Sequence, residues 1–349
     1  MGMRITSSMI SGGYKSQMNK TLSQLDYYTK RANDLRRYRK FSEDPVTASK
    51  AMRMRKIYSQ NEDYRNNIST IGDQYAMAED ATMDIKAILD DARERFERAS
   101  NESTFPKSDL EIYEKTFRGL QKDFLTVVNS KFDDNYVFGG SKATEIPFTV
   151  SEDGKLLYHG VDVDTGIKKE ADGTESTVNL DDIASEEVYI DVGIGVDVKA
   201  NGKVNKASVF NDTLNGLSFF GYGTTDADES KNIYNILGEA ADAIHKCLEN
   251  NDDSAFNLDV AAGYTQRIIA ATDKLTVSIG NLGVKVNQLD RIDARLFEAQ
   301  EDLNEQLSDL EYVDAEEAYT DLAWQQYVYN ASLKIGSKLL QSSFLDYMR

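Results

Sequence analysis

The chain has 349 residues, of which 40% are apolar and 28% charged, and its formal net charge is −19. This composition is typical of a folded protein long enough for two or three domains, and it excludes a chain that is disordered throughout. It also argues against a membrane-spanning protein, because no apolar run approaches the roughly eighteen residues needed to cross a bilayer.

Charge is distributed unevenly along the chain. Residues 1–60 carry thirteen Lys or Arg and four Asp or Glu, whereas residues 290–321 carry twelve acidic and two basic residues. We expect the basic and acidic segments to attract each other. A nucleic-acid-binding arm is the alternative interpretation of the basic segment, but the strongly acidic remainder opposes phosphate binding.

The N-terminal stretch and the cysteine content suggest two possible compartments. The opening MGMRITSSMISGGYKS lacks the hydrophobic stretch and cleavage site of a secretory signal. Cys247 is the single cysteine, so no internal disulfide can brace the fold. We therefore expect either a cytoplasmic protein or one that a dedicated machine exports unfolded, without a cleaved signal.

A first helical stretch ends at a break around Pro45. Its apolar seam consists of Met18, Leu22, Leu25, Thr29 and Ala32. Pro45 lacks a backbone donor and disfavours helical geometry at Asp44, but it suits the first turn of a new helix. We expect one helix to stop at this break and another to start there, with Ser42 as the cap.

The second helix carries an uninterrupted heptad seam and is expected to be about 70 Å long. Its seam positions are Met54, Ile57, Asn61, Tyr64, Ile68, Ile71, Tyr75, Ala78, Thr82, Ile85, Leu89, Ala92, Phe96 and Ala99. The period of 3.5 indicates a rod or coiled coil, and the alanines and polar residues favour close packing inside a bundle.

Further helices follow on both sides of a β-rich middle. Pro106 precedes a seam from Leu110 to Val127, and helical spacing returns over residues 229–248 and again from Ile268 to the C-terminus. In the middle of the chain, between these helices, the period of the apolar residues drops to two, which is typical of strands. Turn signals there are Asp153-Gly154, Asp172-Gly173 and Asn201-Gly202.

These patterns predict a mainly α fold with a β-rich insert. The N- and C-terminal halves would form a long antiparallel helical bundle or coiled-coil rod, plus a small β domain. Residues 1–45 and 313–349 would form a terminal coiled-coil assembly region. The helical rod would comprise 46–140 and 226–312, and the inserted β domain 141–225.

No pattern indicates a catalytic, cofactor or metal site. His159 falls in an expected strand, and His245 and Cys247 are two apart on a helix, so they point in different directions and make a poor metal pair. DVGIGVDV is read as a strand containing glycines, because it lacks the spacing of a nucleotide-binding loop. Trp324 and nearby tyrosines are expected to be packing residues.

Four stretches of the sequence resemble the bacterial flagellar hook-filament junction proteins of the hook-associated protein 3 type, in the flagellin superfamily. The stretches are MRITSSMISGGYKSQMNKTLSQLD, FSEDPVTASKAM, NSKFDDNYVFGGSKATEIPF, and IGNLGVKVNQLDRI together with the closing LSDLEYVDAEEAYTDLAWQQYVYNASLKIGSKLLQSSFLDYM. They cover about residues 3–150 and 229–349. In the second stretch Phe41-Ser42-Glu43 stands where the family more often has Pro-Ser-Asp.

The resemblance implies a non-catalytic structural adaptor in the extracellular flagellum, exported by the flagellar type III apparatus without a cleaved signal peptide. Its partners would be copies of itself, the first hook-filament junction protein, flagellin and an export chaperone, with no nucleic acid and no membrane insertion. Chain ends that are poorly ordered in the free protein would form an inner coiled-coil layer on assembly. The residues expected to act in assembly are Met18, Leu22, Leu25, Asp44, Pro45, Leu322, Tyr329, Leu333, Leu340 and Phe344.

Two alternatives remain open from the sequence. The first is a flagellin that builds the filament itself, although Pro45 directly after Glu43-Asp44, the YVFGGSKATEIPF stretch and the closing FLDYMR favour the junction protein. The second belongs to another class: a carbohydrate-binding or enzymatic β module carried on a helical stalk.

Overall fold

A computed structural model describes residues 7–101, 107–169, 174–195, 204–206, 209–225, 227–250 and 258–347. The chain divides into two compact units. Unit 1 comprises Met1–Asp63 and Phe297–Arg349, and unit 2 comprises Tyr64–Leu296. No helix in the described ranges is both long and apolar enough to cross a membrane.

Long helices dominate both units. They are α1 (Ser7–Asp34), α2 (Pro45–Asn101), α3 (Lys107–Val128), α6 (Ile233–Asn250), α7 (Leu258–Glu311) and α8 (Ala315–Tyr347). Short helical turns occur at α4 (Leu180–Ala184), α5 (Gly216–Phe220) and the 3-10 helix Gly140–Lys142. The expected fold class, mainly α with a small β module, is confirmed.

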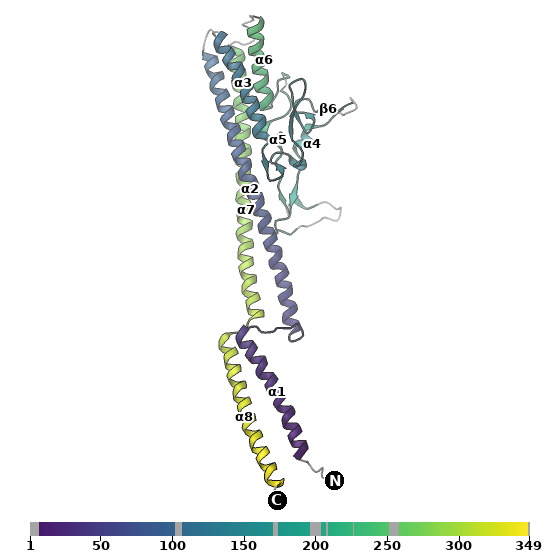
Figure 1. The fold of residues 1–349 in the computed structure, drawn as a ribbon. Helices are drawn as coiled ribbons and strands as arrows, with labels where there is room; N and C mark the ends of the chain where they lie inside the picture. The colour runs from purple at the N-terminus through teal and green to yellow at the C-terminus, as the bar shows by residue number, and fades with distance from the viewer. Residues whose placement is uncertain are drawn as a thin grey trace. The chain divides into compact units, whose positions relative to one another are not determined.

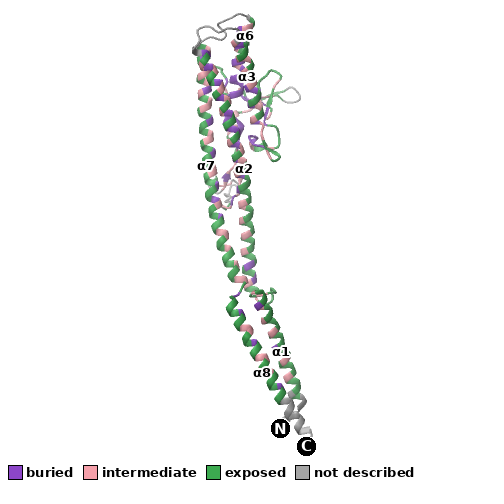
Figure 2. Cartoon of the chain, turned by 60° about the vertical axis from the view of Figure 1, so that its left-hand side comes forward, coloured by how far each residue is buried: buried purple, intermediate pink, exposed green. Residues whose placement is uncertain are grey.

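The heptad seam of α2 forms the centre of unit 2, where α3, α6 and α7 pack beside it (Figure 1). Every seam position from Ile68 to Ala99 is buried, including the polar Thr82. Figure 2 shows these buried positions along the inward sides of the helices. The Thr82 hydroxyl donates to the Ala78 carbonyl oxygen at 2.8 Å, so a polar side chain is tolerated in the seam without an unpaired group.

Aromatic rings join three of these helices near one end of the bundle. Phe96 of α2 stacks on Phe117 of α3, with 4.4 Å between ring centroids, and on Tyr264 of α7, with 5.5 Å. Both Phe96 and Phe117 are almost completely buried. On α6, the expected face from Ile233 to Cys247 is buried as well, so each helix contributes one apolar stripe.

The middle of the chain forms a small β module. Strands β3 (Phe148–Val150), β4 (Leu156–Tyr158), β5 (Val161–Asp162), β6 (Ile167–Lys169) and β7 (Glu175–Thr177) make an antiparallel sheet in sequence order. Two further hairpin pairs are β1 (Lys131–Phe132) with β2 (Asn135–Tyr136), and β8 (Tyr189–Ile190) with β9 (Phe210–Asn211). The expected turn at Asp153-Gly154 connects β3 to β4, with Gly154 at φ +79°.

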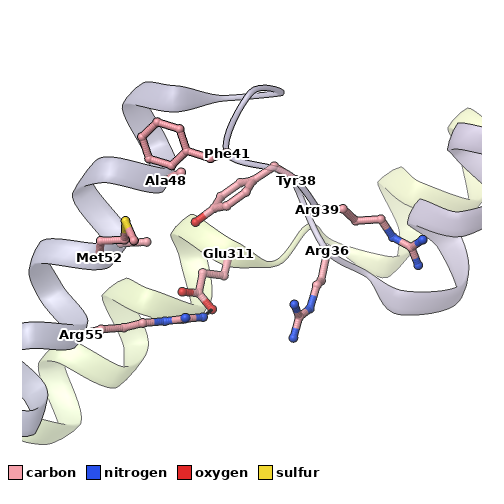
Figure 3. Close-up of a pocket in the computed structure, with 9 residues that line it drawn as sticks. Arg36, Tyr38, Arg39, Phe41, Ala48, Met52, Arg55 and Glu311 are labelled. Carbon is pink, nitrogen blue, oxygen red and sulfur yellow. Dashed lines mark hydrogen bonds and ion pairs between the residues drawn. The ribbon is translucent and has the colours of Figure 1, made fainter.

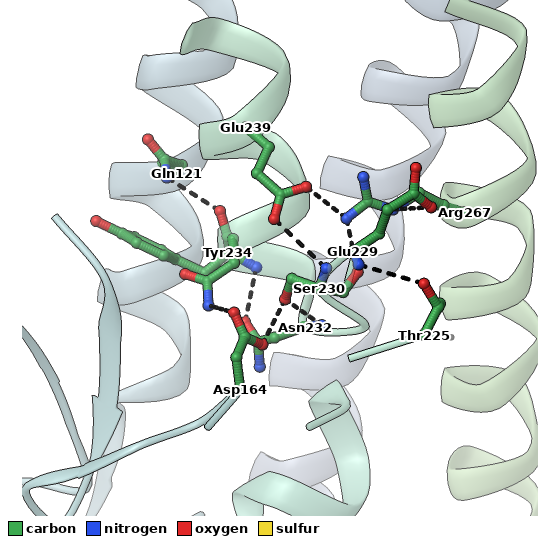
Figure 4. Close-up of polar contacts among 10 residues, drawn as sticks. Gln121, Asp164, Thr225, Glu229, Ser230, Asn232, Tyr234, Glu239 and Arg267 are labelled. Atoms are coloured by element: carbon green, nitrogen blue, oxygen red, sulfur yellow. Dashed lines mark hydrogen bonds and ion pairs between the residues drawn. The ribbon is translucent and has the colours of Figure 1, made fainter. Parts of the chain in front are cut away.

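A buried polar network attaches this module to α6 and α7 (Figure 4). Asp164 accepts hydrogen bonds from Ser230 Oγ at 2.6 Å and Asn235 Nδ2 at 2.7 Å. Arg267 of α7 donates to the Ser230 carbonyl oxygen at 2.6 Å and to Glu239 at 2.7 Å. Burial raises the pKa of Asp164, although both hydrogen bonds lower it. The network therefore fixes the module through several elements at once.

Two local expectations are wrong. His159 lies in the turn after β4 rather than in a strand, with φ +48°, and its Nε2 is 3.0 Å from the Gly139 carbonyl oxygen. In DVGIGVDV, Gly193 lies in a bend rather than a strand, and a Cβ on it would come within 2.8 Å of the Tyr64 ring. Period-two spacing cannot separate short strands from such turns. The turn signals Asp172-Gly173 and Asn201-Gly202, and Pro106, lie outside the described residues.

Candidate functional site

The candidate assembly site lies in unit 1, where α1 and α8 lie side by side (Figure 1). The buried residues between them are mostly small or polar. Gln325 of α8 donates to the Thr21 carbonyl oxygen of α1 at 3.3 Å, and the Tyr14 hydroxyl donates to the Ser332 carbonyl oxygen at 3.1 Å. Gly336 leaves room for the Tyr14 ring, because a Cβ there would lie 2.1 Å from the Tyr14 hydroxyl oxygen.

Ion pairs and a small apolar cluster close the other end of the helix pair. Ala32, Val313 and Ala318 are buried together. Arg31 binds Glu317 and Asp321, each at 2.9 Å. The attraction expected between the basic and acidic segments thus takes the form of ion pairs between α1 and α8.

The expected assembly residues of these two helices are only partly covered. Met18, Leu25, Leu322 and Tyr329 are half-buried, whereas Leu22 and Leu333 are exposed. The side chains of Leu340 and Phe344 lie outside the described part of the chain. The role of all these residues in assembly stays a prediction.

Sequence reasoning missed two of the side chains between α1 and α8. Thr21 and Gln325 are buried although polar, whereas Thr29, a predicted seam residue, is exposed. The spacing Thr21, Leu25, Ala32 follows steps of four and seven, so a seam that admits polar residues would have found it. The predicted seam instead contains the neighbouring Leu22, which is exposed.

The break is confirmed as the place where α2 starts at Pro45, but its cap is different from the one expected. Asp44 Oδ1 accepts a hydrogen bond from the Thr47 backbone N–H at 3.0 Å, and Ser42 is exposed. Asp44 is adjacent to Pro45, so its carboxylate reaches the third residue of the helix as an N-cap does. Hydrogen bonds from Thr47 lower the pKa of Asp44.

A cavity of about 210 Å³ lies beside the break (Figure 3). Phe41 and Met52 line it, together with Tyr38 and the ion pair between Arg55 and Glu311, whose closest atoms are 2.6 Å apart. Burial and the Glu311 carboxylate raise the pKa of Tyr38. The cavity therefore combines an apolar wall with charged groups.

Two aromatic side chains of α8 contradict our expectation. Trp324 and Tyr327 are 66% and 65% exposed, with their rings stacked on each other 5.8 Å apart. They do not pack inside this chain. Two helices alone can cover only one stripe of each other, so the opposite face of α8 stays in solvent.

The described residues contain no group of three or more potential metal ligands. Cys247 is buried, whereas the half-exposed His245 contacts Glu114 at 3.1 Å and Glu249 at 3.2 Å. The arrangement in unit 1 consists of helix packing, ion pairs and exposed apolar side chains. Chemically, such a surface is suited to binding other protein surfaces.

Comparisons with known proteins agree with the expected resemblance. No family model matches the chain. The flagellar hook-associated protein 3 of Escherichia coli (strain K12) is 23% identical over 295 residues, which cover 84% of this chain and 83% of that protein. The chain is similar to flagellar hook-associated protein 3. The protein of the same name from Salmonella typhimurium is 24% identical over 298 residues, with the same coverage of both chains.

Solved structures show that the fold is shared. A putative flagellar hook-associated protein from Vibrio parahaemolyticus is 12% identical, with a TM-score of 0.55, and the match covers 77% of this chain and 100% of that one. The flagellar hook-associated protein 3 of Legionella pneumophila is 14% identical, with a TM-score of 0.51, covering 74% and 98%. The chain therefore has the fold of these flagellar proteins.

Proposed function

We propose that this chain is a structural component of the bacterial flagellum, an adaptor at the hook-filament junction that joins the first junction protein to flagellin. The observation that carries this proposal is the similarity to flagellar hook-associated protein 3 along 84% of the chain, in two organisms. The shared fold supports it, because the match to a solved flagellar hook-associated protein covers 77% of this chain and 100% of that one.

The α1–α8 pair suggests how such an adaptor assembles. Burying one large apolar side chain contributes roughly 1.5–3 kcal/mol, whereas ordering a residue costs about 1–2 kcal/mol. Exposed side chains such as Leu22, Leu333 and Trp324 gain this contribution only when other subunits cover them. We infer that assembly is cooperative and depends on neighbouring copies.

The remaining parts of the proposal follow from the same role. The chain acts without catalysis, outside the cell, after export by the flagellar type III apparatus with the help of a chaperone. The absence of an internal disulfide suits export as an unfolded chain. The acidic net charge of −19 favours solubility of subunits before assembly.

Electron microscopy of cells lacking this chain tests the proposal. We expect hooks without filaments, and flagellin released to the medium. Restoring the full chain should restore filaments. A chain lacking residues 313–349 should be exported and keep a folded unit 2 but fail to restore them. Normal filaments in the deletion strain would contradict the junction role.

Seeded growth of purified protein separates the junction role from that of a flagellin. A flagellin would extend filament seeds into long filaments by itself. We expect this chain to add no more than a short cap to such seeds. Long filaments made of this chain alone would replace the junction role by that of a filament subunit.

A further inference from the structure

The segment between α1 and α2, with the first turns of α2, presents a positively charged surface with apolar side chains in it. We call Arg36, Arg39, Phe41, Met52 and Lys56 the basic patch. Phe41 and Met52 are 54% and 64% exposed, and both line the cavity of Figure 3. Lys56 lies one turn after Met52 on the same side of α2. Large apolar side chains held open to solvent among cations are typical of a protein-binding surface.

The positive charge here exceeds what the chain itself neutralises. Residues 36–56 carry eight Lys or Arg against Glu43 and Asp44. Within this unit, Arg55 pairs with Glu311 and Arg39 with Asp34. In the described part of the chain, neither Arg36 nor Lys56 forms a salt bridge. The basic patch therefore keeps a positive surplus that an acidic partner can neutralise.

The same unit carries a surface of opposite charge. The acidic face of α7 consists of Glu298, Glu301, Asp302, Glu305 and Asp309, all exposed. At 100° per residue these five positions fall within an arc of about 100°, so they share one side of the helix. None of the five carboxylates forms a salt bridge within the described ranges. The buried Leu296 and the half-buried Leu307 lie on the opposite side.

We propose that the basic patch of one copy docks on the acidic face of α7 in a second copy of this chain. Charge complementarity between the two surfaces sets the partner and the orientation. Phe41 and Met52 would be buried in the contact and add an apolar contribution that salt does not screen. Because two different surfaces meet, the contact is head-to-tail: the first copy keeps its acidic face unused, and the second keeps its basic patch.

This inference rests on the proposed function, because head-to-tail contacts let identical adaptors follow one another around a ring or helix. It goes further by naming the surfaces through which copies recognise each other. These surfaces are separate from the side chains that pack between α1 and α8, since they lie at the break and on α7. A chain that keeps its α1–α8 pairing can therefore lose this contact alone.

Cysteine cross-linking of the full-length chain tests the contact directly. One sample carries Phe41→Cys and the other Glu301→Cys, and a short thiol-specific linker is added to their mixture at low salt. We expect covalent dimers in the mixture at least about tenfold above either sample alone. The native chain is a control for the buried Cys247, and Met83→Cys mixed with Glu301→Cys is a control for random collision, because Met83 is also exposed on α2.

Salt and charge reversal then test the physical cause. In about 1 M salt the Debye length falls to about 3 Å, so the dimer yield should fall severalfold. Arg36→Glu with Lys56→Glu in the first sample should reduce the yield to that of the Met83→Cys control. Adding Glu298→Lys with Glu305→Lys to the second sample should restore it. Circular dichroism checks that each variant keeps its helices.

Three outcomes would overturn the inference. The first is a dimer yield no higher than the Met83→Cys control. The second is a yield that charge reversal leaves unchanged. The third combines two results: cells carrying Arg36→Glu with Lys56→Glu lose their filaments, but no cross-link forms between copies of the chain. The basic patch would then bind a different protein. The proposed function is judged separately, by the strain lacking the chain, so either hypothesis can fail alone.

Discussion

At the scale of single residues, the same Gly→Ala substitution should change the free energy of unfolding in opposite directions at two positions. A Cβ on Gly216 would meet the buried Phe148 ring at 2.5 Å, whereas a Cβ on Gly283 in α7 meets nothing within 4 Å. Gly216→Ala should therefore lower the free energy of unfolding by about 1–3 kcal/mol through overpacking. Gly283→Ala should raise it by about 0.5–1 kcal/mol, because alanine favours a helix interior. Urea unfolding measures both, and equal effects would contradict the packing at Gly216.

A second prediction at this scale concerns the carboxyl group of Asp212. Burial raises its pKa to about 6, although Tyr75 and Lys285 beside it lower that value. The unfolded chain gives up this proton near pH 3.9, so between about pH 4 and 6 the folded state holds more protons. The native chain should accordingly lose stability relative to Asp212→Asn as pH rises from 4 to 7.

The expected size of that difference follows from the two pKa values. One pKa unit corresponds to about 1.4 kcal/mol, so the relative stability of Asp212→Asn should change by about 2–3 kcal/mol across this range. Urea unfolding at several pH values measures it. Asp153→Asn, at an exposed turn, is the matched control and should give parallel curves. A constant difference between native and Asp212→Asn would refute the effect of burial.

At the scale of elements, the stack of Phe96 on Phe117 and Tyr264 should hold α2, α3 and α7 together. Phe96→Ala removes the shared ring and should cost about 3–5 kcal/mol in the free energy of unfolding. Ile112→Ala on the exposed side of α3 is the control, with an expected change below about 0.5 kcal/mol. Similar losses for the two variants would mean that the ring stack does not hold the helices.

Among the elements, some could be predicted from the sequence and others could not. The α2 seam was predictable because one apolar period runs from Ile68 to Ala99 against partners of the same chain. The break at Pro45 was predictable because proline chemistry is local. The seam of α1 was not, because Thr21 is buried through a contact with Gln325, about three hundred residues away. The basic patch emerges only when the break brings Phe41 beside Met52.

At the scale of the whole molecule, the two units should differ in stability. Unit 2 has a continuous apolar core of helices and strands, whereas the buried apolar cluster of unit 1 contains Ala32, Val313 and Ala318. Regions with few buried apolar contacts open locally at low free energy. We expect amides of α1 and α8 to exchange with solvent at least about a hundredfold faster than those of α2 between Ile68 and Ala99.

Gly336→Leu should increase the difference in hydrogen exchange between the α1–α8 pair and the core of unit 2. A side chain at this position displaces the Tyr14 ring and breaks its hydrogen bond to the Ser332 carbonyl oxygen. Hydrogen exchange should then accelerate in α1 and α8 and stay unchanged in the core of unit 2. Gly280→Leu is the control, because a Cβ there meets nothing within 4 Å. If the termini of the native monomer are as protected as α2, they do not depend on neighbouring subunits, and the account of assembly through unsatisfied terminal surfaces is wrong.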